Sequence, residues 1–266
     1  MPGLSAHAAT DVGRVRERNE DSLLLLPSHA VYVVADGMGG HASGDVASQT
    51  SISAIKSFFE DEDLTATLRQ EYRELRRTAE GRLPFHAFEQ YCLYRALESA
   101  NTSIFNTARR IPRYKDMGTT IVSTLFVRNR IYVGFVGDSR LYRIRGGRIA
   151  QLTEDHSLAN EYIRMNILKK EDLPHFPYKN VIVRALGLND TARIDTFHRE
   201  CRPGDLYLLC TDGLTDLVTD DEIMEVIDGA PDLGEACERL VDRANAYGGV
   251  DNITVLLVRV DEGLAA

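Results

Sequence analysis

Cysteine is scarce in this chain, and it is not clustered. The four cysteines, Cys92, Cys201, Cys210 and Cys237, are scattered over 266 residues, and no two of them form a C-x-x-C pair. Zinc sites and disulfide frameworks rely on closely or regularly spaced cysteines. We therefore expect neither, and we predict reduced, buried thiols in a cytoplasmic protein.

An excess of basic charge and a long apolar run are also missing. Lys and Arg number 31 against 40 Asp and Glu, and the net charge of −9 argues against a nucleic-acid-binding surface. No apolar stretch approaches the roughly 20 residues of a membrane span. The first residues, MPGLSAHAATDVG, lack the basic start and apolar core of a secretory signal. The remaining composition, 44% hydrophobic and 27% charged, is typical of a globular domain with one large core.

Short apolar runs rich in Val, Ile, Tyr and Leu predict buried strands, and amphipathic spacing predicts the helices between them. Strands are expected at 6–10, 22–26 and 31–35, in TIVSTLFV, RIYVGFV, LYRIR, RIAQL and LYLLCT, and in the final ITVLLVRV. Helices are expected at about 45–59, from Pro84 to about 110, and near 219–228 and 232–246. Adjacent hairpins imply antiparallel sheets, which long amphipathic helices must cover.

Two segments interrupt this pattern. Residues 60–82 carry many charges at helical spacing and predict a solvated helix, and together with the amphipathic helix that follows they make up a helical excursion at about 60–112. The segment at about 157–182 is broken by Pro174 and Pro177 and predicts a mobile surface flap. No linker, internal repeat or low-complexity segment is visible. The prediction is therefore a single domain over residues 1–266.

Four aspartates stand at the ends of apolar runs: Asp36 in VYVVADGMGG, Asp138 in IYVGFVGDSR, Asp212 in LYLLCTDG and Asp251 in GGVDNITVLLV. Each of them alone is explained as a turn or N-cap residue. Burying four unpaired carboxylates is costly, however, and three of them have a glycine neighbour that permits close backbone approach. One shared compensating charge explains the set, and a hard divalent cation such as Mg²⁺ or Mn²⁺ supplies it.

Three shorter phosphate-binding patterns fit less well. Residues 37–42 satisfy G-x-G-x-x-A after a strand, but Asp36 would face the pyrophosphate of a dinucleotide, and no second parallel strand follows. Cys237 and Arg243 have the C-x5-R spacing of cysteine phosphatases. The residues between them are acidic and helix-forming, which disfavours a thiolate, so we expect Cys237 in the core of a helix. The G-x-x-x-x-G-K-[ST] motif of a P-loop does not occur.

Eight short blocks occur in order along the chain: TDVGRVRERNED, ADGMGGHASGDVAS, MGTT, VGDSRLYRI, LTEDHSL, VIVRALG, CTDGLTD and GGVDNITVLLV. Through these blocks, from about Thr10 to Val258, the chain resembles the metal-dependent protein phosphatase (PPM) family, the type 2C Ser/Thr phosphatases, in its compact bacterial form. The resemblance implies an α+β fold. It is a four-layer α/β/β/α sandwich of two mainly antiparallel sheets flanked by helices, with a binuclear Mn²⁺ or Mg²⁺ centre in a cleft at one edge.

The same resemblance implies ligands for the two core ions. Asp36 bridges both metals, and the carbonyl of Gly37 binds one of them. Asp212 and Asp251 complete the protein ligands of the other. The chemistry agrees, because two divalent ions that share a water lower its pKa and supply hydroxide at neutral pH.

Further acidic residues take supporting roles in the resemblance. Asp138, with Asp212 and Asp216, resembles a site for a third metal ion in bacterial members. Glu20 acts through a metal-bound water, and Asp21 supports the same shell of ligands.

Arg16 matches the family's phosphate-binding arginine. A guanidinium fork suits phosphate oxygens, and it stabilises charge in the transition state. Arg14 and Arg18 lie nearby in the sequence, and the residue pattern alone does not choose among the three.

One departure concerns proton donation to the leaving group. Many eukaryotic relatives have His directly after the Asp-Gly pair, where this chain has Met38, and a thioether cannot donate a proton. His41 lies in the same loop, and His156 in EDHS is expected to anchor the start of the flap. The general acid therefore stays unassigned.

The resemblance predicts metal-dependent hydrolysis of phosphoserine and phosphothreonine on proteins by a metal-activated water, opposing a bacterial Ser/Thr kinase. Two alternatives stay open: a catalytically inactive member that serves as a binding or sensing module, and a phosphatase tuned to one regulator such as a phosphorylated anti-sigma-factor antagonist. The intact metal positions argue against the first, and the second needs the same chemistry. We expect a monomer with phosphoprotein partners and neither nucleic acid nor membrane, and the 60–112 excursion is a candidate docking element.

Overall fold

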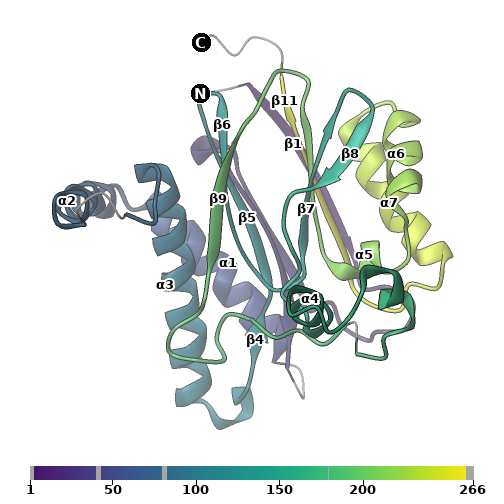
Figure 1. Ribbon diagram of the computed structural model, residues 1–266, viewed down its shortest axis with the longest axis horizontal. Helices are drawn as coiled ribbons and strands as arrows, with labels where there is room; N and C mark the ends of the chain where they lie inside the picture. Colours follow the sequence, from purple (N-terminus) through teal and green to yellow (C-terminus); the bar gives the residue numbers. More distant parts are fainter. Residues whose placement is uncertain (1–2, 40–42, 80–82, 179, 262–266) are drawn as a thin grey trace.

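Two antiparallel sheets packed face to face form the centre of the computed structural model, and helices lie on both outer sides (Figure 1). The structure describes residues 3–39, 43–79, 83–178 and 180–261. One sheet contains, in order, β1 (Leu4–Asp11), β11 (Ile253–Val260), β10 (Leu206–Cys210), β7 (Arg140–Arg145) and β8 (Arg148–Gln151). The other contains β2 (Asp21–Leu26), β3 (Val31–Met38), β5 (Ile121–Val127), β6 (Arg130–Val136) and β9 (Asp195–Glu200), with β4 (Gly118–Thr119) paired to β3.

Both faces of the central strands are buried, as β3 illustrates. Val31 and Val33 pack in the cluster beneath the helices, whereas Tyr32 and Val34 pack in the cluster between the two sheets. Successive side chains of a strand point to opposite faces, so a strand that is covered on both sides must be apolar throughout. This explains why the central strands appear in the sequence as continuous apolar runs.

The helices complete four layers. α1 (Gly44–Glu60) and α3 (Phe88–Arg110) cover the sheet that contains β3, and α6 (Asp220–Asp228) and α7 (Leu233–Ala246) cover the sheet that contains β11 (Figure 1). The predicted α/β/β/α sandwich is confirmed. The shorter helices are η1 (Pro27–His29), η2 (Pro112–Tyr114), α4 (Leu158–Arg164), η3 (Lys170–His175) and α5 (Asp212–Thr215). Within the described residues, none of the helices has the length and apolar character needed to cross a bilayer.

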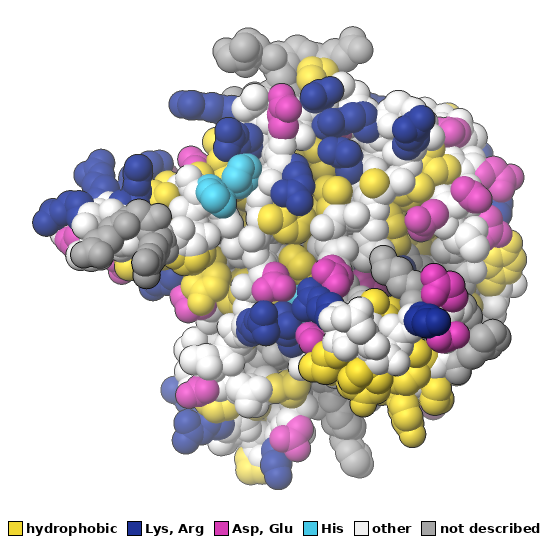
Figure 2. Space-filling model, viewed as in Figure 1, with side chains coloured by type: hydrophobic (Ala, Val, Ile, Leu, Met, Phe, Trp, Pro, Cys, Tyr) yellow, Lys and Arg dark blue, Asp and Glu magenta, His cyan; other side chains and the backbone are white. Residues whose placement is uncertain are grey.

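The predicted excursion contains a helix that stands at the side of the sandwich. α2 (Glu62–Thr78) begins where the carboxylate of Asp61 accepts a hydrogen bond from the Leu64 amide, and it buries only Leu68 and Tyr72. These two side chains pack in a small separate cluster with residues of α1 and α3. Charged side chains cover the outer side of α2 (Figure 2).

The flap, residues 157–182, is closed at its base by backbone hydrogen bonds. The Leu158 amide donates to the Val181 carbonyl at 2.8 Å, and the Val183 amide donates to the His156 carbonyl at 2.9 Å. Between these points the segment contains only α4, η3 and turns, and it exposes Met165 and Ile167. Pro174 lies within η3, and Pro177 follows it in a turn.

Two features of the sheets differ in how clearly the sequence predicts them. The β7–β8 hairpin turns at Gly146 and Gly147, both with positive φ, as a tight two-residue turn requires. Strand β9, by contrast, was absent from the prediction. It is an edge strand that pairs only with β6, and its sequence, DTFHRE, is mostly polar because one side of the strand is open.

Candidate metal centre

Five aspartates come together where strands of both sheets end. Asp36 lies on β3 directly opposite Asp21 at the start of β2. Asp138 lies in the turn from β6 to β7, Asp212 begins α5 after β10, and Asp251 precedes β11. Within each sheet, the register of the antiparallel pairs brings these strand ends to the same edge.

The five carboxylates lie near enough to one another to interact electrostatically. Burial raises the pKa of Asp36 well above its usual value. The next causes are the carboxylates of Asp21, Asp212, Asp138 and Asp251. Burial also raises the pKa of Asp21 to about 7, that of Asp138 to about 8 and that of Asp212 to about 6. Like charges in a shared low-dielectric site disfavour ionisation of one another.

Several carboxylate oxygens of the cluster have no hydrogen-bond partner. Oδ1 of Asp21, of Asp138 and of Asp212 are buried and unpartnered in the described part of the chain. Buried carboxylates with free oxygens suit a hard divalent cation.

The described side chains are not arranged as a complete set of metal ligands. No three His, Cys, Asp or Glu side chains within the described residues are gathered tightly enough to hold a metal ion as they stand. One reason is visible at Asp251, whose Oδ2 accepts a hydrogen bond from Arg16 at 2.7 Å. The donor chemistry therefore fits the predicted metals, and Asp251 has to release Arg16 before this oxygen can act as a ligand.

Polar residues that the sequence analysis did not single out hold these carboxylates in place. The Thr211 hydroxyl donates to Asp21 Oδ2 at 3.0 Å. The Asn252 side chain accepts from the Glu20 amide and donates to the carbonyls of Val12 and Arg18, so it ties the arginine-rich segment to β11. Their only signal in the sequence is their position beside Asp212 and Asp251.

Glycines allow the backbone to pack closely around the centre. A Cβ atom added to Gly44 would lie 2.7 Å from the Gly37 carbonyl oxygen and 2.6 Å from Glu20 Oε2. A Cβ added to Gly213 would lie 2.0 Å from the Asn252 carbonyl oxygen. The start of α1 therefore lies against Gly37 and Glu20 at distances that only glycine permits.

Glu20 precedes β2 in the chain, and its side chain lies against Gly44 at the start of α1. Its carboxylate accepts a hydrogen bond from the Gly44 amide, while burial and then the Asp45 carboxylate raise its pKa. Its own carbonyl accepts a hydrogen bond from the Gly37 amide at 3.1 Å. Glu20 is thus fixed beside Gly37 through both backbone and side chain.

Of the three candidate arginines, Arg16 is the one that the structure places against the carboxylates. Its guanidinium donates to Asp251, and Glu20 and Asp36 also contribute to its raised pKa. Arg14 contacts Gly249 through its backbone amide, and Arg18 accepts from Asn252 through its carbonyl. Just over half of the Arg16 side chain is exposed, at 53%, so the guanidinium is accessible to a ligand.

Asp216 lies on the other side of Asp212. Its amide donates to the Asp212 carbonyl at 2.8 Å, and its carboxylate is a cause of the raised pKa of Asp212. One of its oxygens accepts from Asn180 of the flap at 2.8 Å. The structure thus brings Asp138 and Asp216 to the same carboxylate, Asp212, and connects the group to the flap.

The position after Asp36 and Gly37 supplies no proton donor for the leaving group. Met38 pairs with Gly118 in the backbone and offers only a thioether. His41 lies outside the described residues, and His156 is buried, with 1% of its surface exposed. The general acid remains unassigned to a side chain.

Cys237 is a core residue of α7, as predicted. Its thiol is fully buried and donates to the His7 carbonyl at 3.4 Å, and burial raises its pKa to about 12. A thiol in this state is not a nucleophile at neutral pH. The C-x5-R spacing therefore has no catalytic meaning here.

The layered fold and the carboxylates at its edge define a class of metal-dependent hydrolases. The chain belongs to the protein phosphatase 2C family, whose model matches residues 14–248. It is 34% identical over 261 residues to the serine/threonine phosphatase stp of Listeria monocytogenes, an alignment that covers 97% of this chain and 96% of that protein.

Solved structures agree with this assignment. The Mycobacterium tuberculosis serine/threonine phosphatase PstP/Ppp superposes with a TM-score of 0.83 at 32% identity, over 97% of this chain and 99% of that one. The catalytic domain of PstP in complex with two manganese ions gives a TM-score of 0.80 at 33% identity, with the same coverage of both chains.

Proposed function

We propose that this chain is a metal-dependent protein phosphatase that hydrolyses phosphoserine and phosphothreonine on proteins. The observation that carries the proposal is the buried cluster of carboxylates with unpaired oxygens beside the accessible guanidinium of Arg16. The cluster supplies oxygen donors for hard cations, and the guanidinium supplies a partner for the phosphate. Family membership and the manganese-bound relative support the same reading.

We assign the core ligands to Asp36, the Gly37 carbonyl, Asp212 and Asp251. A third, more weakly held ion would be bound by Asp138 with Asp212 and Asp216. Two ions of Mn²⁺ or Mg²⁺, when bound, supply a water of lowered pKa and neutralise charge on the phosphate.

The chain's own groups bind and orient the substrate around these ions. Arg16 would bind phosphate oxygens in place of the Asp251 carboxylate, which would then be available as a ligand. Glu20, which the Gly44 amide holds beside the start of α1, would orient a water of the site, and Asp21, held by Thr211, would support the same shell of ligands. Met38 cannot protonate the leaving alkoxide, so that proton comes from solvent or water in the site.

Hydrolysis of a generic aryl phosphate tests the proposal and separates it from an inactive binding module. We expect activity with Mn²⁺ or Mg²⁺, loss of activity in EDTA and recovery on adding back either ion. Zn²⁺ should substitute poorly, because the assigned ligands include neither His nor Cys. Full activity after exhaustive chelation would rule out the metal assignment.

The proposal extends to partners and organisation. We infer phosphorylated protein substrates, including a Ser/Thr kinase and its targets, and a role in cytoplasmic signalling. We further propose one phosphatase domain that acts as a monomer, in which the 60–112 excursion serves as a docking element through its outer helix α2, since α3 packs in the core. Comparing a phosphoproteome with and without active enzyme would identify the substrates.

A further inference from the structure

His156 connects the turn that carries Asp138 to an ion-pair network under the flap. Its ring accepts a hydrogen bond at Nδ1 from the Gly137 amide, at 3.1 Å, and its own amide donates to the Gly137 carbonyl at 2.9 Å. The imidazole is 1% exposed and stacks on Phe135 with ring centres 5.0 Å apart. The turn and the histidine therefore hold each other by two hydrogen bonds in a buried position.

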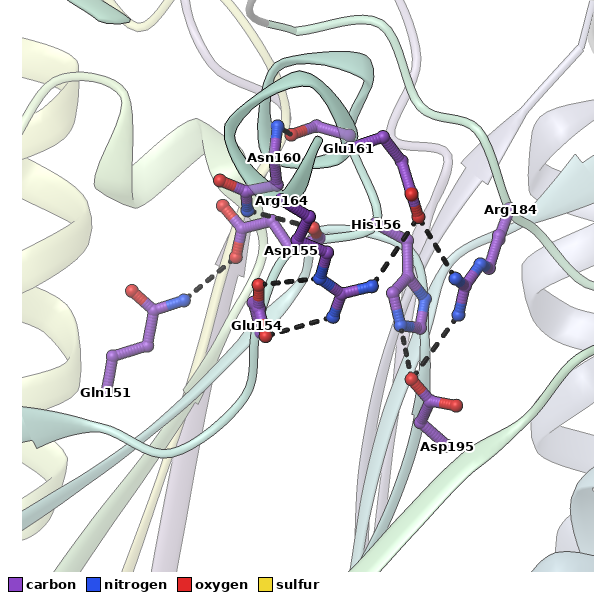
Figure 3. Close-up of polar contacts among 10 residues, drawn as sticks. Gln151, Glu154, Asp155, His156, Asn160, Glu161, Arg164, Arg184 and Asp195 are labelled. Atoms are coloured by element: carbon purple, nitrogen blue, oxygen red, sulfur yellow. Dashed lines mark hydrogen bonds and ion pairs between the residues drawn. The ribbon is translucent and has the colours of Figure 1, made fainter. Parts of the chain in front are cut away.

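The second ring nitrogen fixes the orientation of the imidazole. Because Nδ1 accepts, Nε2 carries the hydrogen, and it donates to Asp195 Oδ2 at 3.0 Å (Figure 3). That hydrogen bond is the largest cause of the lowered pKa of Asp195. Asp195 is therefore an ionised acceptor that determines which nitrogen faces Gly137.

The network continues into the flap. Arg184 bridges Asp195 Oδ2, at 3.3 Å, and Glu161 Oε1 of α4, at 3.1 Å. Arg164 links Glu161 to Glu154, at 3.5 and 2.9 Å (Figure 3). Through Asp195 and Arg184, the ring of His156 is thus connected to Glu161 of the flap.

The turn has a backbone conformation and a close packing that only glycine permits. Gly137 has φ of 103°, and an added Cβ would lie 2.5 Å from Thr120 Cβ. The next residue is Asp138, whose Oδ1 is buried without a hydrogen-bond partner in the described part of the chain. With that oxygen unsupported by other side chains, the position of the carboxylate depends on the turn.

We propose that His156 is a positioning residue that fixes the Gly137–Asp138 turn and thereby the Asp138 carboxylate, in a ring orientation set by Asp195. The inference rests on the proposed function in one respect, since it takes Asp138 as a ligand of the peripheral metal ion. The clamp on the turn itself is independent of any metal.

Two substitutions distinguish the roles of the two ring nitrogens of His156. His156→Asn places an amide oxygen near the position of Nδ1, so it keeps the acceptor for the Gly137 amide and loses the contact with Asp195. His156→Gln places an amide nitrogen near the position of Nε2, so it keeps the donor to Asp195 and loses the acceptor for Gly137. Both variants remove the buried ring, so a purely structural role would affect them alike.

Two measurements test the proposal: hydrogen exchange of the Gly137 amide by NMR, and calorimetric titration with Mn²⁺. In His156→Gln we expect the amide to exchange at least about 10-fold faster and the peripheral Mn²⁺ to bind roughly 10–100-fold more weakly, the range for groups that support a metal ligand. In His156→Asn both should stay within about 3-fold of the unaltered protein. His198→Asn, which removes a histidine of β9 that does not contact the turn, is the control and should change neither.

If His156→Gln does not fold, Asp195→Ala replaces it, because the Asp195 side chain is 35% exposed and its loss creates little cavity. Without this acceptor the tautomer is no longer fixed, and faster exchange at Gly137 is expected. Equal effects of His156→Asn and His156→Gln, or a Gly137 amide protected in every variant, would overturn the proposal. If the unaltered protein binds Mn²⁺ at the core but nowhere else, the third-metal assignment fails, and the exchange data alone decide whether His156 holds the turn.

Discussion

At the scale of single residues, Arg16 shows how one side chain can serve two partners. In the structure its guanidinium holds Asp251, which the proposed centre needs for metal, and slightly more than half of the side chain remains exposed. Phosphate offers the guanidinium a second anionic partner with two oxygens in matching geometry. The arginine and the aspartate are therefore expected to separate when metal and substrate bind.

Replacing Arg16 by Ala should weaken phosphate binding and leave metal content unchanged at saturating Mn²⁺, because Arg16 is not a ligand and its loss only frees Asp251. Loss of a bidentate, charge-assisted contact costs about 2–4 kcal/mol, which corresponds to a fall in kcat/KM of roughly 30-fold to 1,000-fold. Steady-state kinetics beside metal analysis measures both quantities. Arg14→Ala and Arg18→Ala are matched controls, and a larger effect from either would show that the register of this segment is misassigned.

Asp36 and Asp138 should differ in what their neutralisation removes. Asp36→Asn is expected to lower turnover by several orders of magnitude, because it takes away the carboxylate proposed to bridge the core ions. Asp138→Asn should keep the core pair and lose only the weaker ion, with a smaller loss of activity. Metal stoichiometry measured beside the rate distinguishes the two variants, and equal loss of all metal from both would contradict the division into core and peripheral sites.

At the scale of elements, the sequence predicted best those segments whose environment leaves a periodic or conformational mark. The central strands are buried on both faces, so they appear as apolar runs, and the Gly146–Gly147 turn needs positive φ at both positions. Strand β9 carries no such mark, since it pairs on one side only and contains Asp195, His198 and Glu200.

The residues of the site also divide into those that the sequence predicted and those that it did not. The aspartates were recognisable because carboxylates at the ends of buried strands are unusual. The pairing of His156 with Asp195 was not, because the partners are 39 residues apart and one lies on the unpredicted strand. Contacts between distant polar residues leave no pattern in either local segment, so only the fold reveals them.

The flap is the element that we expect to affect substrate choice. Its base is closed by backbone hydrogen bonds, and Asn180 reaches Asp216 at the centre, but the flap supplies none of the core ligands assigned above. Shortening it between Met165 and Tyr178 should therefore lower kcat/KM for phosphopeptides much more than for a small aryl phosphate, which does not extend past the metals. Both rate constants are measured on one variant of confirmed metal content. Equal losses on the two substrates would assign the flap to support of the metal centre itself.

At the scale of the whole molecule, the carboxylate cluster makes stability depend on pH in the metal-free protein. The folded state raises the pKa of Asp21 to about 7, of Asp138 to about 8 and of Asp212 to about 6, well above the usual value of an aspartate. Between about pH 4 and pH 8 the folded protein therefore holds protons that the unfolded chain has lost. Stability falls with rising pH wherever the folded state binds more protons.

Thermal unfolding in EDTA should show this fall directly. We expect the melting temperature of the metal-free protein to decrease from pH 5 to pH 8, with a loss on the order of a few kcal/mol in the free energy of unfolding. Saturating Mn²⁺ should remove or reverse the trend, because a cation that binds only the folded state stabilises it and is favoured by deprotonation. A metal-free melting temperature that is flat or rises over this range would contradict the picture of mutually repelling carboxylates.

The place of β11 between β1 and β10 has a consequence for how the molecule is made. The six strands of the sheet that contains β3 are complete by residue 200, so this half can collapse while later residues are still being synthesised. The other sheet must keep a gap beside β1 until residues 253–260 emerge and enter it. Asp212 and Asp251 join Asp21, Asp36 and Asp138 only at that late step, so a nascent chain holds an incomplete set of carboxylates until its last strand is in place.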